Sequence, residues 1–239
     1  MSELLDFAIA AHGGWDRWEN ISRIVAKARI GGALWGMRGK AGILDDVTVT
    51  ALAHSPHLEY APFGAAGRHS LWEPDLTAIV DADGRTVDNR LNTRESFEGL
   101  TREDKWDDQH LIYFSGYAMW TYLTTPFLFK LPGFLEHEVE PWDEDGETWR
   151  RLRVLFPPTV PSHSTEQTFY FDRSGILKRH DYVAEVAGGL PAANYADDPQ
   201  TFDGIVFPTK RRVYVRDAEN KPMKERLAVS IDFDDVRLT

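Results

Sequence analysis

Apolar and polar residues follow two different periods along this chain of 239 residues. Over most of its length they alternate in short runs, which is the pattern of strands that bury one face. Residues 107–134 differ, because apolar side chains there cover nearly the whole circumference of a helix. Two neighbouring helical stripes contain Tyr113, Tyr117, Trp120 and Thr124 in the first, and Ile112, Met119 and Leu123 in the second. Such a helix must be covered on more than one side, and the cover is protein, ligand or membrane.

Both ends of this helix are marked in the sequence. Asp107 and Asp108 suit its N-cap and the positive end of the helix dipole, and the residue before Pro126 avoids the helical region. Residues 111–129 are uncharged and nearly long enough to span a membrane. They nevertheless include three threonines, three tyrosines, a serine, a glycine and a proline, and the upstream flank is acidic. We therefore predict a buried or lid helix over residues 107–125 and no membrane insertion.

The remaining pattern predicts a short N-terminal helix and many strands. Residues 2–12 form an amphipathic helix that a pair of glycines ends, and Trp15 and Trp18 then anchor the chain by packing. Residues 31–40 have the glycine content of a bulged strand or hairpin, and residues 187–199 have the composition of a loop. The candidate strands are 24–30, 48–50, 57–63, 67–73, 77–81, 85–91, 134–141, 148–156, 167–172, 176–184, 207–216 and 225–232.

Turn signals between these strands determine the expected fold class. Dipeptides such as Asp83-Gly84 and Asp145-Gly146 are typical of tight hairpins, and tight hairpins join antiparallel strands. The chain shows no alternation of strand and helix, no repeat of fixed period and no low-complexity tract. We predict one domain over residues 1–239, mainly β with an α+β organisation. In it, one strongly bent antiparallel sheet holds the aromatic helix against its concave face.

Composition excludes several classes of function. The net charge of −11 argues against nucleic acid as a partner, and equally against electrostatic attraction to anionic lipid head groups. The chain has no cysteine, so it has no disulfide framework, thiol nucleophile or thiolate metal site. Residues 1–6 lack the basic region and long apolar core of a signal peptide, so a cytoplasmic location is expected unless a leader precedes these residues in the natural protein.

Candidate catalytic chemistry is sparse. The eight histidines lack metal-ligand spacing, so we expect neither a metal site nor a cofactor, and no G-x-S-x-G elbow is present. The densest polar run on a predicted strand is residues 178–182. Alternation places His180 on the same face as Lys178 and Tyr182, with Arg179 and Asp181 on the other face. If His180 faces inward, it is able to act as a base or to bind a ligand head group; if it faces outward, it is a surface residue.

Several stretches resemble one known fold family. They are residues 11–14 before the first strand, residues 169–179, residues 202–210 and the closing residues 230–236. With the order of elements, they are similar to the lipoprotein-carrier (LolA/LolB-like) superfamily, and the chain looks closest to an uncharacterised bacterial group. The resemblance implies a half-barrel that encloses an apolar cavity, closed by helices, which in the carriers takes up acyl chains. This chain lacks an export signal and a lipid-attachment cysteine, which argues against lipoprotein transport itself.

Three functions compete on this basis. The leading hypothesis is a non-enzymatic binding or carrier protein for a small apolar or amphipathic, lipid-like molecule. The alternatives are an enzyme that uses His180 as its acid–base group, and a structural domain whose helix only plugs the sheet. The sequence defines neither the ligand nor the oligomeric state. The predicted ligand-binding residues are Tyr113, Tyr117, Met119, Trp120, Phe127, Phe129, His180 and Tyr182.

Overall fold

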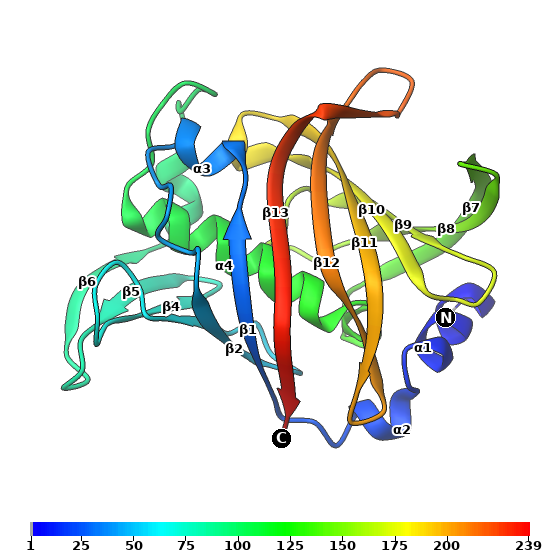
Figure 1. Cartoon of the computed structure of the whole chain (residues 1–239), viewed down its shortest axis with the longest axis horizontal. Coiled ribbons are helices and arrows are strands. Elements are labelled where there is room, and N and C mark those ends of the chain that lie inside the picture. Colours follow the sequence, from blue (N-terminus) through cyan, green and yellow to red (C-terminus); the bar gives the residue numbers. More distant parts are fainter. Residues whose placement is uncertain (1) are drawn as a thin grey trace.

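The computed structural model describes residues 2–239, and within them all named strands belong to a single antiparallel sheet (Figure 1). The helices are α1 (Glu3–Ala11), α2 (Trp15–Trp18), α3 (Ala33–Met37) and α4 (Asp108–Thr124), with short 3₁₀ turns η1 (Thr93–Phe97), η2 (Phe127–Lys130) and η3 (Glu185–Ala187). The first six strands are β1 (Arg23–Gly31), β2 (Val47–Leu52), β3 (Leu58–Ala61), β4 (His69–Glu73), β5 (Leu76–Val80) and β6 (Thr86–Leu91). The others are β7 (Leu135–Glu144), β8 (Glu147–Leu155), β9 (Glu166–Phe171), β10 (Leu177–Ala184), β11 (Leu190–Phe202), β12 (Ile205–Arg216) and β13 (Pro222–Leu238).

The strand order places the two ends of the chain at the centre of the sheet. The order is β6-β5-β4-β3-β2-β1-β13-β12-β11-β10-β9-β8-β7, and β1 pairs with β13 from Ile24↔Leu238 to Gly31↔Ser230. One arm therefore runs outward from β1 to β6 and the other from β13 back to β7. The helix α4 connects the outer ends of these two arms and crosses the hollow between them (Figure 1).

The predicted central helix is confirmed, and so is its position on the concave side of a bent sheet. Asp107 caps it by accepting a hydrogen bond from the backbone N–H of His110 at 2.9 Å, and the His110 ring faces the Asp107 N–H in return. The helix ends at Thr124, immediately before Thr125 and Pro126. Every residue from Gln109 to Thr124 is buried, as expected for a helix that is apolar nearly all round. Within residues 2–239, no helix combines the length and hydropathy needed to cross a membrane.

One glycine allows α4 to lie directly on the sheet. A Cβ added at Gly116 would come within 2.4 Å of the Trp72 ring on β4, a distance that real side chains do not adopt. Beside this contact, the Tyr60 hydroxyl donates a hydrogen bond to the Ser115 carbonyl at 3.0 Å. Helix α4 and the first arm of the sheet thus pack so closely at Gly116 that no space remains between them for one added methyl group.

Helix α2 packs on η2, the turn that follows α4. Ser2 caps α1 by accepting from the Leu5 N–H, and the buried Trp18 ring of α2 stacks on Phe127 of η2 with centroids 4.2 Å apart. The predicted packing of Trp18 at the exit of the first helix is therefore confirmed. Trp15 is only partly buried and lies under the Lys130 ammonium at 4.3 Å.

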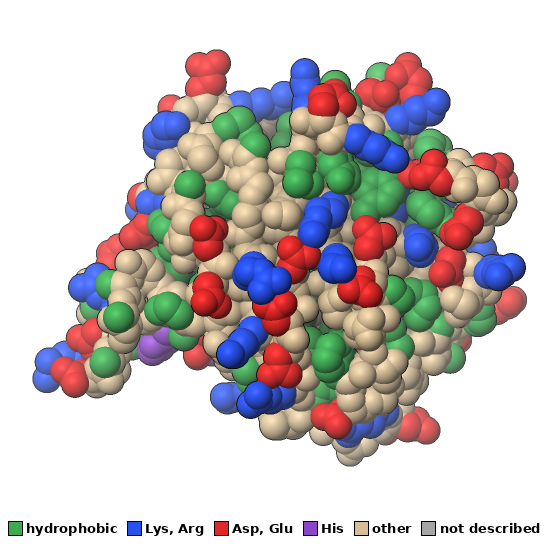
Figure 2. Space-filling view, in the orientation of Figure 1, with side chains coloured by type: hydrophobic (Ala, Val, Ile, Leu, Met, Phe, Trp, Pro, Cys, Tyr) green, Lys and Arg blue, Asp and Glu red, His purple; other side chains and the backbone are tan. Residues whose placement is uncertain are grey.

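The outer face of the sheet is polar. Figure 2 shows basic and acidic side chains intermixed over the central strands. Cross-strand ion pairs account for much of this pattern, including Arg29 with Asp234 and Arg212 with Asp232. Exposed pairs of this kind add little stability, but they keep the convex face in water and direct the apolar face toward α4.

Two of the predicted elements were wrong. Residues 31–40 are not a bulged strand, because Gly32 at φ +115° ends β1 and the short helix α3 follows, with Leu34 and Trp35 buried. Residues 187–199 are not a loop, because most of them belong to the 13-residue strand β11. Their small side chains gave no strand signal, and the ladders to β10 and β12 supply the hydrogen bonds that make this segment a strand.

The Gly116 contact gives a direct stability test. Gly116→Ala should lower the free energy of unfolding by about 1–3 kcal/mol, because the added methyl group forces α4 and Trp72 apart. The matched control is Gly36→Ala in α3, where an added Cβ meets no atom within 4 Å and the substitution should be neutral or slightly stabilising. Urea unfolding of both variants measures the difference, and equal stability for the two would contradict the packing described.

Candidate ligand site under the central helix

A chain of hydroxyl and imidazole groups lies beneath α4. The Tyr117 hydroxyl is 3.2 Å from Nδ1 of His163, and Nε2 of the same histidine is 3.0 Å from the Tyr122 hydroxyl. The Tyr122 hydroxyl lies in turn 2.8 Å from that of Tyr182 on β10. The His163 ring also stacks on Tyr182 with centroids 3.7 Å apart. All four side chains are buried, so the helix carries a polar seam along one side of an otherwise apolar interior.

His180 faces inward, which is one of the two orientations that the sequence left open. Its ring is 1% exposed and stacks on Phe169 at 4.0 Å, and its Nε2 lies 2.6 Å from Oε1 of Gln167. Because a carboxamide oxygen only accepts, Nε2 is the donor in this bond. Burial, then the neighbouring His163 and Arg211, lower the pKa of His180 well below 6.5. Burial and Arg94 do the same to the pKa of His163, so both imidazoles are neutral at pH 7.

A small cavity of about 20 Å³ lies between α4 and the central strands. Its volume corresponds to about one water molecule, so the interior is nearly filled by side chains. Apolar and aromatic groups dominate its lining, which is Ile30, Trp35, Tyr60, Phe114, Ser115, Ala118, Met119, Tyr122, Tyr182, Val229 and Ile231.

An apolar groove of about 430 Å³ opens to the surface on the other side of α3. Leu34 lines the groove whereas its neighbour Trp35 lines the inner cavity, and on β13 the same change occurs between Ala228 and Val229. Helix α3 is therefore the partition between groove and cavity. The groove has Met37 and Leu227 among its apolar residues, and Arg38, Arg102, Glu225 and Arg226 also line it.

A second and larger cleft of about 820 Å³ lies between the two arms of the sheet. Tyr113 of α4 lines it, together with the proline-rich residues 157–161 of the second arm. Arg94 of the first arm crosses to the second arm, where it donates to the Ser162 carbonyl at 3.1 Å and to the Glu185 carboxylate at 2.6 Å. This cleft is more polar than the groove beside α3.

The predicted ligand-binding residues fall into separate groups. Met119 and Tyr182 line the inner cavity, Tyr117 belongs with Tyr182 to the polar seam, and Tyr113 lies in the cleft between the arms. His180 lies beside the seam, with its ring centroid 4.8 Å from that of Tyr182. His180 lines neither the inner cavity, nor the groove beside α3, nor the cleft between the arms.

The other three predicted residues lie in packed layers away from the inner cavity. Trp120 is 0% exposed, contacts Trp72 and donates its indole N–H to the Leu52 carbonyl at 2.9 Å. Phe127 stacks on Trp18, and Phe129 lies among a group of other phenylalanines. The structure therefore does not bring these rings into one wall.

Several residues around the cavity were not predicted. Trp35 lies in the glycine-rich run that was taken for a bulged strand, and His163 lies in a loop where no period applies. Tyr122 lies outside the two helical stripes described above, and only its hydrogen bond to Tyr182 of β10 distinguishes it from the other tyrosines of α4. Val229 and Ile231 carried a recognisable signal, since they alternate along a predicted strand.

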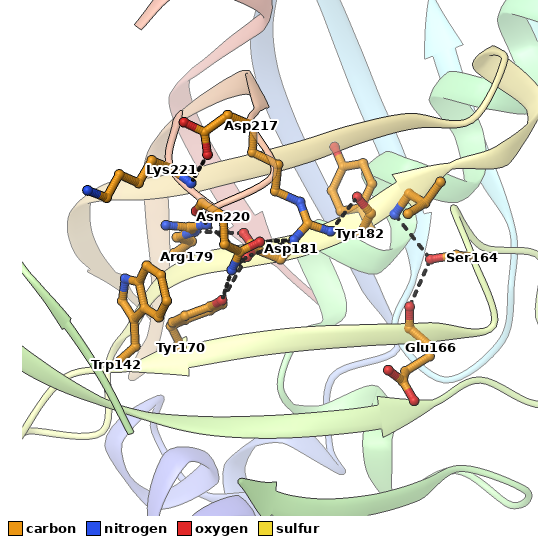
Figure 3. A network of polar contacts seen from close by, with 12 residues as sticks. Trp142, Ser164, Glu166, Tyr170, Arg179, Asp181, Tyr182, Asp217, Asn220 and Lys221 are labelled. Carbon is orange, nitrogen blue, oxygen red and sulfur yellow. Dashed lines mark hydrogen bonds and ion pairs between the residues drawn. The ribbon is translucent and has the colours of Figure 1, made fainter. Parts of the chain in front are cut away.

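Arg179 and Asp181 face the opposite, convex side of β10, as the alternation predicted (Figure 3). Both Asp181 oxygens accept from the Arg179 guanidinium, at 2.6 and 2.8 Å, and one also accepts from the Tyr170 hydroxyl at 2.7 Å. Asn220 of the β12–β13 hairpin adds a further bond at 3.1 Å. A polar cleft of about 560 Å³ borders this group. Both Asp181 oxygens already accept hydrogen bonds, so the carboxylate has a structural role. We call this cluster the clamp, because its bonds to Asn220 hold the β12–β13 hairpin against the convex face of the sheet.

Neither protein-family models nor curated proteins match the sequence. Solved structures do share its fold. A domain from Vibrio parahaemolyticus described as an outer membrane lipoprotein-sorting protein aligns with a TM-score of 0.56 and 11% identity, over 99% of this chain and 91% of its own. A DUF1329 family protein from Desulfovibrio piger aligns with a TM-score of 0.56 and 12% identity, over 98% and 91%. A LolA superfamily protein from Nitrosomonas europaea aligns with a TM-score of 0.55 and 11% identity, over 99% and 92%.

These alignments define the class of structure. The chain has the fold of the LolA superfamily and of the lipoprotein-sorting domain over nearly its full length, so the resemblance inferred from sequence is confirmed for the fold. Because the sequence identity is only 11%, the similarity concerns the architecture and does not extend to individual site residues. Among residues 2–239, no cluster of three or more histidine or acidic side chains is arranged to hold a metal ion.

The position of Trp120 changes the expected effect of its removal. A ring that lined a pocket would have few protein contacts to lose, but the observed ring is fully buried and hydrogen-bonded. Trp120→Ala should therefore lower the free energy of unfolding by about 3–5 kcal/mol, the usual cost for a packed core ring. Urea unfolding without ligand measures this loss, and a change below about 1 kcal/mol would mean that the ring is not packed as described.

The neutral buried histidines make stability depend on pH. Burial lowers the pKa of His12 to about 4, and the pKa values of His163 and His180 also lie well below 6.5, whereas the unfolded chain binds protons near pH 6.5. The unfolded state therefore gains protons first, and the free energy of unfolding should fall below pH 6.5 by up to about 1.4 kcal/mol per pH unit for each histidine. Urea unfolding between pH 7.5 and 5 measures this slope, which His163→Gln should reduce.

His57 provides a control of opposite sign for this slope. Hydrogen bonds to Glu59 and Glu73 raise the pKa of His57, so it stabilises the fold at low pH and loses that effect as pH rises. His57→Gln should therefore make the loss of stability on acidification steeper. If His163→Gln also made this loss steeper, the assignment of His163 as a neutral buried imidazole would be untenable.

Proposed function

We propose that this protein binds and carries a small apolar or amphipathic molecule, whose apolar part lies between α4 and the inner face of the sheet. The observation that carries this proposal is the partition at α3. An apolar surface groove and an apolar inner cavity are separated by the thickness of one short helix, with Leu34 on one side and Trp35 on the other.

The lining of both spaces supports a ligand with a long apolar part. Apolar and aromatic side chains predominate in each, with a small number of hydroxyl and charged groups, which is the usual composition of small-molecule sites. The groove volume of about 430 Å³ lies in the range of such sites. The similar structures include a domain described as lipoprotein-sorting, which favours a carrier over an enzyme.

Uptake into the interior requires side chains to move, because the inner cavity holds only about one water molecule. Trp35 is the side chain that closes the route. Its ring lines the cavity, and its indole N–H donates to the carbonyl of Gly31, the last residue of β1, at 3.0 Å. We expect α3 to shift when a ligand passes from groove to cavity.

Blocking the groove tests this proposal. Ala33 is exposed at the start of α3 and lines the groove, so Ala33→Trp should fill it without disturbing the core. We expect the parent protein to bind the uncharged dye N-phenyl-1-naphthylamine with increased dye fluorescence, and the variant to bind it at least about tenfold more weakly. Ala66→Trp, at an exposed loop position outside the groove, is the matched control and should bind like the parent.

Two results would refute the proposal. Absence of dye binding to the parent protein would argue for a helix that only plugs the sheet. Equal binding by the parent, Ala33→Trp and Ala66→Trp would exclude the groove beside α3 as the route of entry.

A further inference from the structure

Arg211 on β12 is a buried cation whose donors are only partly used. Its side chain faces the concave side and is 1% exposed. Its Nη2 donates to the Tyr122 carbonyl at 3.0 Å, and the guanidinium lies over the Tyr122 ring, 4.6 Å from the centroid. Its Nε and Nη1 have no hydrogen-bond partner within residues 2–239, and no carboxylate in that range forms an ion pair with it.

The hydrogen bond to the Tyr122 carbonyl gives one N–H group of Arg211 a partner, but it does not account for the burial of the others. The Tyr122 carbonyl belongs to the last turn of α4, where a cation interacts favourably with the helix dipole. This favourable effect is smaller than the cost of burying an unpaired charge. Burial lowers the pKa of Arg211 to about 10, so the group remains charged at pH 7. A protein seldom retains such a cation without an anionic partner for it.

A buried amide lies on the same face of the sheet. Arg211 is paired with Ala196 on β11, so Asn194 is two residues along the strand and points the same way. Asn194 is completely buried beside the Tyr122 hydroxyl, and neither of its amide atoms makes a hydrogen bond of ordinary geometry within residues 2–239. The unused N–H donors of Arg211 on β12 and Asn194 on β11 therefore lie close together, beside Tyr122 of α4.

Apolar residues of β13 lie between this place and the surface groove. Arg211 pairs with Ile231 on β13, and Ile231 and Val229 line the inner cavity. Ala228 then lines the groove beyond α3. At about 3.4 Å per residue, the distance along β13 from Ile231 to Ala228 is roughly 10 Å. A chain of medium length would thus reach from the guanidinium to the groove.

We propose that Arg211, assisted by Asn194, is the head-group site for a carboxylate, and that the ligand is a fatty-acid-like anion whose chain runs along β13 toward α3. This inference rests on the proposed function and defines the chemical class of its ligand. The carboxylate accepts hydrogen bonds from the free guanidinium N–H groups and supplies the negative charge that the interior lacks.

The test compares dodecanoate with dodecanol, which share a chain and differ in the charge of the head group. Each displaces N-phenyl-1-naphthylamine from the parent protein, from Arg211→Met and from Arg211→Lys at pH 7.4. We expect the parent to bind dodecanoate at least about tenfold more tightly than dodecanol, the effect of one hydrogen-bonded charge pair. Arg211→Met should lose this preference and still bind dodecanol, and Arg211→Lys should retain part of it.

A second readout distinguishes a binding role from a structural one. Without ligand, Arg211→Met should keep or raise the thermal midpoint, because it removes an unpaired buried charge. The control is Arg212→Met, which removes the same charge from the convex face, where Arg212 pairs with Asp232 at 2.7 Å. This control should retain the preference for dodecanoate.

Each result has one interpretation. If the parent binds neither compound nor the dye, the proposed function itself is wrong. If the parent binds both compounds equally, the head-group site is refuted while the carrier function stands, and no variant is needed to reach that conclusion. If Arg211→Met lowers the thermal midpoint and leaves the preference for dodecanoate intact, Arg211 serves only to hold the end of α4.

Discussion

The structure depends on the enclosure of one helix that has no polar face. Because all of its residues from Gln109 to Thr124 are buried, α4 is stable only where protein surrounds it. The sheet meets this requirement by bending, and the contact of Gly116 with Trp72 sets the distance between helix and strands. The two arms then extend past the helix on either side and approach each other near Arg94, which bonds to both Ser162 and Glu185.

This enclosure places polar groups where water does not reach. The hydroxyl and imidazole groups of Tyr117, His163, Tyr122 and Tyr182 satisfy one another in a continuous chain, and both buried imidazoles near this chain remain neutral. A connected polar network of this kind favours one arrangement of an interior over others. Arg211 is the exception, because it brings a charge into the same interior without a carboxylate. The hydroxyl and imidazole groups of the network already have hydrogen-bond partners and serve the fold, whereas the free N–H groups of Arg211 are available to a ligand.

The two faces of β10 serve different purposes. On the concave face, His180 and Tyr182 contribute to the interior, whereas on the convex face Arg179 and Asp181 bind the β12–β13 hairpin through Asn220 (Figure 3). The hairpin begins where β12 and β13 leave the groove beside α3. The clamp on the convex face therefore holds the strands that form one wall of the proposed entry route, and it does so with charges that already have partners.

The sequence by itself determined the central helix, the antiparallel fold and the two faces of β10. These are local properties: Asp107 caps its own helix, Pro126 ends it, and alternation separates His180 from Asp181 whatever surrounds them. Only the tertiary structure decided that β11 is a strand, because its small side chains become a strand through the ladders of its neighbours. It also decided which aromatic rings pack and which line the cavity, since a helix that is apolar all round gives each ring the same signal. The burial of Arg211 is likewise invisible in the sequence, because the side chain faces inward only through the register of β12 with β11 and β13.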